Sequence, residues 1–372
     1  MVVLDRIVLT ELQWTQLRGL AEEVVEFSGL RPEDVSARLK VEQAANVGAV
    51  CFTALAQERT TVDMLNERLE GADAVITCWT NLPDGVLKAN SQIRYIGFWT
   101  NLPFHRVSMK LAEEMGIVVT HIPDYGTESV AEWTMTVLLS MARQPARHVQ
   151  ESGSGKWVYE LIKRALYIPS PKDIEFFTLQ GKKLGIIGFG RIGQRVAELV
   201  TAFGMQVRYY SLHRRPEWEK KGVEFMELDE LLGWADVVSN HLSPYANSDL
   251  QGRVQLDDFA PDCPEQDQVH KDTPVITAER LAMIRDGAIF INTAAGRLVD
   301  EEALKREAQS GRIRVAIDVW RSNPDRRWLG VMKNLFKRDK HILTYRAAWF
   351  TRDAVTFKGD ELVRQAIEFL SR

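Results

Sequence analysis

The sequence predicts an α/β protein with parallel β-sheets. Two stretches, around residues 72–98 and 184–211, each show a strand, a helix and a second strand in succession. A connection of this kind joins strands that run in the same direction. The chain has 372 residues, which is enough for two domains with separate cores.

The first strand–helix–strand pattern contains a repeated pentapeptide, WTNLP, at residues 79–83 and 99–103. The apolar runs ADAVITC and IRYIGF precede the two copies, and their composition is typical of buried parallel strands. DGVLKANSQ lies between them and predicts a short helix. Both copies then follow carboxyl ends of parallel strands, where open α/β sheets bind ligands. The predicted substrate contacts in these loops are Trp79, Trp99, Thr100 and Asn101.

The composition gives no reason to expect nucleic acid or a membrane as a partner. The net charge is −4, and no apolar run reaches the roughly 20 residues of a membrane-spanning helix. Cys51, Cys78 and Cys263 are scattered without metal-ligand spacing, so we predict no metal site. Cys51 and Cys78 lie in apolar runs, which predicts buried, inert thiols. The N-terminal residues do not resemble a secretory signal, and a cytoplasmic location is expected.

The second pattern contains the motif Gly188-x-Gly190-x-x-Gly193 between a strand, LGIIGF, and a helix, GQRVAELVTAFG. A further strand, QVRYYS, follows. This context is typical of dinucleotide binding: the first glycine allows a tight turn, the second lets a pyrophosphate approach, and the third lets the helix pack closely. The helix N-terminus then offers N–H groups and a positive dipole end to the phosphates. The loop residues Arg191 and Ile192 belong to the predicted site.

The residues after the second strand of this pattern favour NADP(H) over NAD(H). An acidic residue at that position would hold the adenosine ribose, but the chain has Ser211, followed by His213, Arg214 and Arg215. A hydroxyl group and two guanidinium groups suit a 2′-phosphate. The alternative interpretation is a solvated basic loop.

The chain resembles the D-isomer-specific 2-hydroxyacid dehydrogenases along nearly its whole length. The segments that carry the resemblance are GTESVAEWTMTVLLSMAR, LQGKKLGIIGFGRIG, ADVVSNHLSP, MIRDGAIFINTAAGRLVDEEAL and AIDVW, in the family's order. The resemblance implies a Rossmann cofactor domain inserted in a flavodoxin-like substrate domain, with the cofactor in the cleft between them, and a homodimer. It implies a substrate domain at residues 1–121 and 347–372 and a cofactor domain at residues 122–346.

The resemblance also implies a further set of cofactor contacts. They lie in the HLSP motif, after the strand GAIFIN and after the strand VAI. These residues are His241, Leu242, Ser243, Thr293, Ala294, Ala295 and Asp318.

The three catalytic side chains of the family are replaced. Ala295 stands in place of the arginine that clamps the substrate carboxylate, Asn323 in place of the acid, and Arg346 in place of the histidine. Arginine does not release its proton at ordinary pH, so the usual proton relay is absent. Loss of a general acid costs about 10²- to 10⁴-fold in rate. We therefore expect ordinary 2-oxo acid reduction to fail.

Two residues are candidates for a rebuilt catalytic set. Arg346 either holds an anion or developing oxyanion, or forms a structural salt bridge. His105, in NLPFH, is either a replacement acid or a partly buried loop histidine. Arg297 is expected to point away from the site, because alternate residues at a strand end face opposite sides.

An additional segment at residues 245–272 separates HLSP from the next family motif. Its Pro, Asp and Gln content predicts a loop, which either covers the cleft, binds a partner or is solvated decoration.

The main functional prediction is an NADP(H)-dependent oxidoreductase with a non-standard active site. The aromatic loops suggest a larger or aromatic small-molecule substrate, including compounds with C=C or C=N bonds. The alternatives are a catalytically inactive NADP(H)-binding protein that binds a regulatory partner, and redox-neutral chemistry in which the hydride returns within one cycle.

Overall fold

A computed structural model of the chain describes two compact units. The first comprises Met1–Gly126 and Phe350–Arg372, and the second Thr127–Asn247 and Thr273–Trp349. The assignment of substrate and cofactor roles to predicted domains stays a prediction. The described residues are 1–4, 7–26, 61–78, 80–101, 106–153, 155, 158, 161–162, 166, 176–242, 274–319, 341–344 and 346–370.

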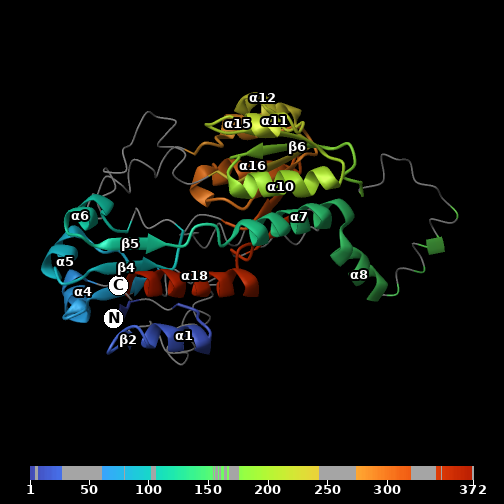
Figure 1. The fold of residues 1–372 in the computed structure, drawn as a ribbon. Coiled ribbons are helices and arrows are strands. Elements are labelled where there is room, and N and C mark those ends of the chain that lie inside the picture. The colour runs from blue at the N-terminus through green and yellow to red at the C-terminus, as the bar shows by residue number, and fades with distance from the viewer. Residues whose placement is uncertain are drawn as a thin grey trace. The chain divides into compact units, whose positions relative to one another are not determined.

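The first unit is built on a five-stranded parallel sheet, ordered β2-β1-β3-β4-β5. This is the flavodoxin-like strand order, and Figure 1 shows the helices arranged around it. The strands are β1 Val2–Val3, β2 Val25–Glu26, β3 Ala74–Thr77, β4 Tyr95–Phe98 and β5 Val118–His121.

Both faces of this sheet are covered by helices because alternate strand residues are apolar on both sides. Val75 and Ile96 pack against α4, α5 and α6, whereas Ile76 and Tyr95 pack against α1 and α18. Gln13 ties α1 to α18, because its Nε2 donates to Asp360 Oδ1 at 2.7 Å. The helices are α1 Glu11–Arg18, α4 Val62–Leu69, α5 Asp84–Ala89, α6 Met109–Glu114 and α18 Arg352–Leu370.

The predicted strand–helix–strand unit around the WTNLP repeat is confirmed. β3 and β4 are parallel, with Ala74 opposite Tyr95 and Thr77 opposite Phe98, and α5 connects them. A short parallel bridge joins Leu82 to Val107, where the Leu82 N–H donates to the Arg106 oxygen at 2.7 Å. The ends of the two repeat loops therefore lie side by side.

The second unit contains a seven-stranded parallel sheet, ordered β12-β11-β10-β9-β6-β7-β8. Counted along the chain from β6, this is the doubly wound order of dinucleotide-binding domains, with the reversal between β6 and β9. The strands are β6 Lys183–Ile187, β7 Gln206–Tyr210, β8 Glu224–Phe225, β9 Val237–Asn240, β10 Ile289–Asn292, β11 Arg314–Ile317 and β12 Ile342–Leu343.

Helices cover both faces of this sheet as well. α7 and α10 pack on one face through residues such as Leu138 and Val196, and α12, α15 and α16 pack on the other through Leu231, Leu281 and Leu304. Figure 1 shows α10 on one side of β6, with α12 and α15 on the other. The helices are α7 Thr127–Arg143, α8 Pro145–Gly153, α10 Arg191–Ala202, α11 Pro216–Glu219, α12 Leu228–Trp234, α15 Ala278–Met283 and α16 Glu301–Ser310, with a 3₁₀ turn at Gly296–Leu298.

None of the helices in the described ranges has the length and apolar character needed to cross a membrane. Within the same ranges, no three His, Cys, Asp or Glu side chains gather closely enough to hold a metal ion. Cys78 is buried, as predicted, whereas Cys51 and Cys263 lie outside the described residues.

Candidate active site

The turn between β6 and α10 requires glycine at its first and last motif positions. Gly188 has φ +90°, and a Cβ there would lie 2.6 Å from the Leu242 nitrogen and 2.7 Å from the His241 oxygen. A Cβ on Gly193 would lie 2.4 Å from the Gly188 oxygen. Both positions are therefore fixed by close contacts between backbone atoms.

Gly190 is glycine for a different reason. It is the N-cap of α10, with φ −79° and ψ −166°, which is extended backbone that any residue adopts. A Cβ at this position would meet nothing within 4 Å. The protein's own packing therefore does not demand glycine here, and the missing side chain leaves open space beside the helix N-terminus.

This turn fits a dinucleotide pyrophosphate. The N-cap supplies no side-chain hydrogen bond to the first turn of α10, so the helix end keeps backbone N–H groups and a positive dipole end for an anion. The open space at Gly190 gives such a group a route to that end. Arg191 and Ile192 begin the helix, as the sequence predicts.

The two predicted phosphate-binding arginines differ in their surroundings. Arg214 makes two bonds to the Glu219 carboxylate, at 3.0 and 2.7 Å, and its side chain is 62% exposed. The Arg215 Nε atom is buried and has no hydrogen-bond partner among the described residues. Ser211 is partly buried just after β7, and His213 is exposed. Arg215 is thus the better candidate for binding a phosphate oxygen, because the Arg214 guanidinium is already bound to a carboxylate.

His241 is held as a neutral imidazole between two strands. Its Nε2 lies 2.8 Å from the Ser239 hydroxyl and its Nδ1 3.2 Å from the Thr293 hydroxyl. Burial lowers the pKa of His241 to about 4. A neutral ring has one donor and one acceptor nitrogen, so it can satisfy both hydroxyl groups while it fixes the end of β10.

Two asparagines that the sequence reasoning missed connect the strand ends. The Asn240 amide donates to Asn292 Oδ1 at 3.1 Å, and the Asn292 amide donates to the Val319 oxygen at 3.2 Å. Asn292 Oδ1 also accepts the Ala294 N–H. The signal was present in the sequence, because the buried strands VVSN and IFIN both end in asparagine.

Asp318 organises the segment that follows β12. Its carboxylate accepts hydrogen bonds from the Thr344 hydroxyl and from the N–H groups of Ala347 and Ala348, at 2.5, 2.8 and 3.2 Å. The Arg346 N–H donates to the Asp318 backbone oxygen at 2.9 Å. Arg346 has φ +52° and is partly buried. These bonds fix the backbone that carries the Arg346 guanidinium.

The predicted cofactor residues of the second unit therefore share one edge of its sheet. Leu242, Ala294, Asp318 and Arg346 follow the carboxyl ends of β9, β10, β11 and β12. Ala295 begins the 3₁₀ turn and packs against the core.

In the first unit, the predicted contacts of the second repeat loop differ in burial. Trp99 is 4% exposed, and its backbone N–H donates to the Thr77 backbone oxygen at 2.8 Å. Thr100 is partly buried and its oxygen accepts the Ile122 N–H, whereas Asn101 is exposed. The Trp99 indole is thus a core side chain at the carboxyl end of β4.

A second residue that the sequence reasoning missed lies against this indole. Lys358 of α18 is 2% exposed, and its Nζ lies 3.6 Å from the centroid of the Trp99 ring and 4.2 Å from that of Tyr125. The signal was a lysine in the apolar stripe that Ala354, Leu362 and Ala366 form at helical spacing.

Several predicted features fall outside the described residues, and their roles stay predictions. They are Trp79, His105, Ser243, Asn323 and the additional segment at 245–272.

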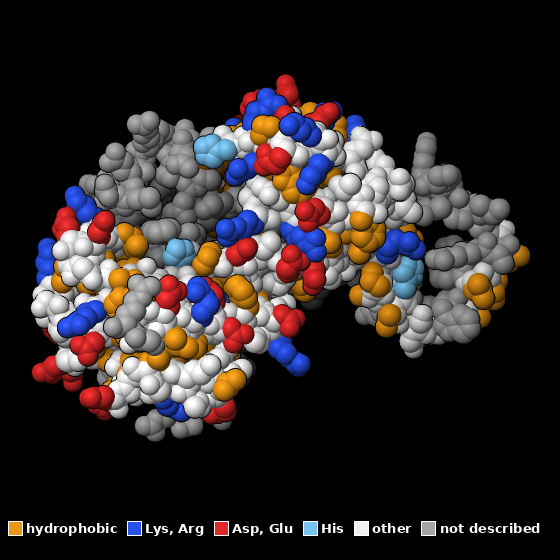
Figure 2. Space-filling model, viewed as in Figure 1, with side chains coloured by type: hydrophobic (Ala, Val, Ile, Leu, Met, Phe, Trp, Pro, Cys, Tyr) orange, Lys and Arg blue, Asp and Glu red, His pale blue; other side chains and the backbone are white. Residues whose placement is uncertain are grey.

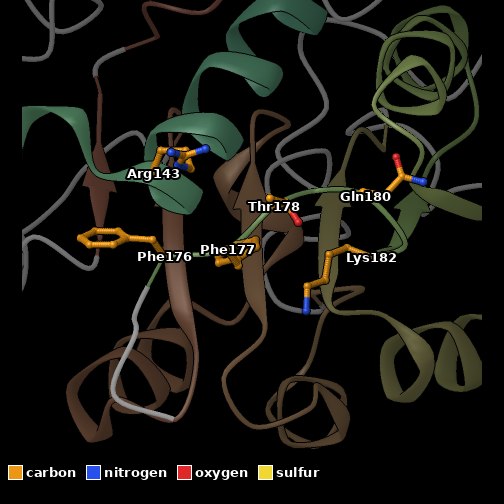
Figure 3. A pocket seen from close by; sticks show the side chains of 6 residues that line it. All are labelled: Arg143, Phe176, Phe177, Thr178, Gln180 and Lys182. Atoms are coloured by element: carbon orange, nitrogen blue, oxygen red, sulfur yellow. The ribbon is translucent and has the colours of Figure 1, made fainter. Parts of the chain in front are cut away.

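A surface pocket of about 580 Å³ lies elsewhere on the second unit, and Figure 3 shows the six side chains that line it. Lys182 immediately precedes β6, so the pocket adjoins the amino edge of the sheet, opposite the glycine turn. It is therefore not the cofactor site. The lining residues are Arg143, Phe176, Phe177, Thr178, Gln180 and Lys182.

Sequence comparisons place the chain in a known family. The family model "D-isomer specific 2-hydroxyacid dehydrogenase, NAD binding domain" matches residues 135–261 and 262–345. The chain is 30% identical to a hydroxypyruvate reductase of Blautia hydrogenotrophica over 324 residues, which cover 84% of this chain and 88% of the relative. It is 31% identical to a glyoxylate reductase of Thermococcus kodakarensis over 265 residues, which cover 70% of this chain and 71% of the relative.

Solved structures share the fold. The TT0316 protein of Thermus thermophilus matches with a TM-score of 0.67 and 26% identity, covering 98% of this chain and 94% of that one. A D-lactate dehydrogenase of Aquifex aeolicus, complexed with NAD and lactic acid, matches with a TM-score of 0.68 and 22% identity, covering 100% and 96%. An acyclic imino acid reductase in complex with NADPH and D-Arg matches with a TM-score of 0.66 and 19% identity, covering 100% and 97%.

The parallel sheets, the glycine turn and these matches agree with one another. The chain belongs to the D-isomer-specific 2-hydroxyacid dehydrogenase family and is an NAD(P)-dependent oxidoreductase.

Proposed function

We propose that the protein is an NADP(H)-dependent reductase with a non-standard active site, acting on a larger or aromatic substrate that includes C=C or C=N compounds. The observation that carries this proposal is the combination of a complete glycine turn with Ala295 and Arg346 at two positions where the family has catalytic side chains. When bound, NADPH supplies the hydride.

The second unit contains groups suited to each phosphate of the cofactor. The first turn of α10 would hold the pyrophosphate beside Gly190. Ser211 and Arg215 would hold the 2′-phosphate, since Arg215 Nε is buried with no partner among the described residues. Arg214 would join them by exchanging Glu219 for the phosphate, because an exposed ion pair contributes only about 0–1 kcal/mol.

The carboxyl ends of the central strands would receive the nicotinamide. Neutral His241 orients the Thr293 hydroxyl without placing a positive charge beside the ring. The Asp318 carboxylate has four acceptor sites, and three of them accept from residues 344–348 after β12. Among the described residues, the fourth acceptor site would serve the carboxamide. Leu242, Ser243, Ala294 and Ala295 complete the proposed nicotinamide contacts.

Arg346 would act as a fixed cation rather than as an acid. A guanidinium group has hydrogen-bond donors and no acceptor, so it would stabilise negative charge on the substrate. The bonds between Asp318 and residues 344–348 hold its backbone in place before any substrate arrives. The proton would come from another group, for which His105 is the candidate.

Stopped-flow oxidation of bound NADPH against a panel of acceptors tests the proposal. The panel contains glyoxylate, hydroxypyruvate, aromatic 2-oxo acids, imino acids and enoates. We expect oxidation with at least one larger acceptor and glyoxylate turnover about 10²-fold or more below that of a family member with the full catalytic set. Glyoxylate or hydroxypyruvate turnover at family rates would defeat the proposal, and binding without any turnover would favour a regulatory role.

We further propose that the protein is a homodimer formed through the second unit. Among the described residues of α8 and of the stretch up to residue 166, Val149 is 72% exposed, Leu161 60% and Leu166 84%. Figure 2 shows hydrophobic side chains in orange on the surface of the part of this segment that is drawn in colour. A second copy would cover such a surface, and the pocket beside Arg143 and Phe177 offers a receiving groove of mixed apolar and cationic character.

Light scattering coupled to size-exclusion chromatography tests the dimer. We expect twice the chain mass for the unmodified protein and a shift toward the monomer for Leu161→Glu with Leu166→Glu. The matched control is Leu12→Glu, because Leu12 lies on α1 of the other unit and is 69% exposed. This substitution should leave the measured mass unchanged. A monomeric unmodified protein would refute this proposal.

A further inference from the structure

We propose that Glu219 and Tyr209 set how strongly the protein prefers NADPH over NADH. Glu219 is a specificity-determining residue, whose carboxylate competes with the 2′-phosphate of the cofactor for Arg214. Tyr209 is a positioning residue, whose hydroxyl holds Arg215 in place while Arg214 changes partner. The inference rests on the proposed function, since it assumes that the residues after β7 bind the 2′-phosphate, and it names two residues that regulate that site.

The Glu219 carboxylate, at the end of α11, accepts three hydrogen bonds. Arg214 donates two of them, from Nε at 3.0 Å and from Nη2 at 2.7 Å, and the Tyr209 hydroxyl donates the third at 3.1 Å. The hydrogen bond from Arg214 lowers the pKa of Glu219, so the group is ionised at neutral pH. Because a guanidinium binds carboxylates and phosphates through the same fork of N–H donors, Glu219 holds donors that a phosphate would use.

The ion pair between Arg214 and Glu219 can open at little cost. The Arg214 side chain is 62% exposed, and water solvates the charges of such a pair when it separates. The guanidinium also lies over the Phe225 ring, 5.1 Å from its centroid, so its position does not depend on Glu219 alone. A bound 2′-phosphate would therefore take over Arg214, and the released carboxylate would remain close to a second negative charge. This repulsion lowers the affinity for NADPH and does not affect NADH, which has no phosphate there.

Tyr209 holds the backbone of Arg215 by a single side-chain oxygen. The Tyr209 side chain is fully buried, and its hydroxyl oxygen accepts the Arg215 backbone N–H at 2.5 Å. Burial raises the pKa of Tyr209, so the hydroxyl keeps the proton that it donates to Glu219. Arg215, whose Nε atom is buried without a hydrogen-bond partner in the described part of the chain, thus keeps its position when Arg214 moves.

The Tyr209 ring also connects this loop to the glycine turn. It stacks on Phe189, which lies between the first two motif glycines, with ring centroids 4.1 Å apart and an interplanar angle of 21°. Phe189 in turn meets the Trp218 ring of α11 edge-on, at 5.3 Å and 86°. One aromatic cluster within the second unit therefore supports both the turn proposed for the pyrophosphate and the loop proposed for the 2′-phosphate.

Calorimetric titration of the full chain with NADPH and with NADH tests the competition in Glu219→Gln. We expect NADPH to bind about two- to fivefold more tightly than to the unmodified protein, the effect of removing an exposed charge pair, and NADH to bind as before. The glutamine amide oxygen can still accept the Tyr209 hydroxyl proton, so the substitution removes the charge and leaves that contact available.

The same titrations test the positioning role in Tyr209→Phe. This substitution keeps the ring stack but leaves the Arg215 backbone N–H without its acceptor. We expect NADPH binding to weaken about 3- to 10-fold, the effect of losing one hydrogen bond, with NADH binding unchanged. A merely structural role would weaken both dinucleotides alike.

The chain offers a matched control for each substitution. Glu217→Gln removes the same charge from an exposed position of α11, and it should leave both affinities unchanged. Tyr210→Phe removes the hydroxyl of the next residue in β7, which packs against the core on the other face of the sheet, and it should also change neither affinity. A thermal melt by circular dichroism checks that each variant is folded.

Unchanged or weaker NADPH binding by Glu219→Gln would overturn the competition, as would equal tightening by Glu217→Gln. Equal loss of NADPH and NADH binding by Tyr209→Phe, or failure of this variant to fold, would overturn the positioning role, because the hydroxyl would then serve the fold as a whole. Equal affinities of the unmodified protein for NADPH and NADH would instead defeat the phosphate site of the proposed function. The unmodified protein is titrated first, so the two failures are distinguished.

Discussion

Substitution of Gly190 separates a requirement of the fold from a requirement of the cofactor. A Cβ at this residue would meet nothing within 4 Å, and its backbone is in an extended conformation that alanine adopts without strain. Gly190→Ala should therefore leave the free energy of unfolding unchanged or raise it by about 0.4–1 kcal/mol, through the lower entropy of the unfolded chain.

The same substitution should weaken NADPH binding strongly. The new methyl group would stand in the open space beside the first turn of α10, where we place the pyrophosphate. Displacement that removes one charge-assisted hydrogen bond costs about 1.5–3 kcal/mol, which raises the Kd about 10- to 150-fold. NADPH fluorescence titration measures this change, and a thermal melt by circular dichroism measures stability.

Two other glycines provide the comparison. Gly85→Ala in α5 also adds a Cβ that meets nothing within 4 Å, and it should leave NADPH binding unchanged. Gly188→Ala should destabilise the fold itself, because its Cβ would lie 2.6 Å from a backbone nitrogen at φ +90°. If Gly190→Ala binds NADPH as tightly as the unmodified protein, the pyrophosphate does not lie at the glycine turn and the reasoning fails.

Three further predictions address the cofactor phosphate, the catalytic set and the buried imidazole. Ser211→Asp should repel the 2′-phosphate and raise the Kd for NADPH, relative to the Kd for NADH, about tenfold or more. A fluorescence titration measures both constants, and an unchanged ratio would show that Ser211 does not contact the 2′-phosphate. The triple variant Ala295→Arg, Asn323→Glu, Arg346→His restores the family's catalytic side chains and should raise glyoxylate turnover about 10²-fold or more. NADPH oxidation measures this turnover against that of the unmodified protein. No gain would show that the pocket differs from the family in more than these three side chains. Because the pKa of His241 is lowered from 6.5 to about 4, the unfolded chain binds more protons between these values. Stability should therefore fall by up to about 3 kcal/mol as the pH drops through this window. In urea unfolding, the free energy of unfolding of His241→Asn should fall less between pH 6.5 and 4 than that of the unmodified protein. The same dependence of this free energy on pH in both proteins would contradict the lowered pKa of His241.

The sequence was sufficient for the elements that depend on local pattern. The apolar runs around Ile76 and Ile96 predicted parallel strands, and the glycines at 188 and 193 predicted a tight turn with close helix packing. These features depend on periodicity and on backbone sterics, which neighbouring residues determine.

The rest of the site depends on contacts between residues far apart in the chain. Nothing adjacent to Lys358 in the sequence shows that it meets Trp99, since 259 positions separate the two, from 99 to 358. The link between Asn240 and Asn292 likewise joins residues that are 52 positions apart. The pairing of Arg214 with Glu219 spans only five positions, but it depends on side-chain directions that the residue pattern does not give. The arginine pairing changes the interpretation most, because it makes Arg215 the better candidate for the 2′-phosphate.

Calorimetric titration of the unmodified chain with NADPH and with NADH tests the central claim most directly. The glycine turn, Ser211 and Arg215 together should hold NADPH at least about tenfold more tightly than NADH, because the 2′-phosphate adds one or more charge-assisted hydrogen bonds. Equal affinities, or tighter binding of NADH, would contradict the proposed phosphate site, and binding of neither dinucleotide would contradict the whole account.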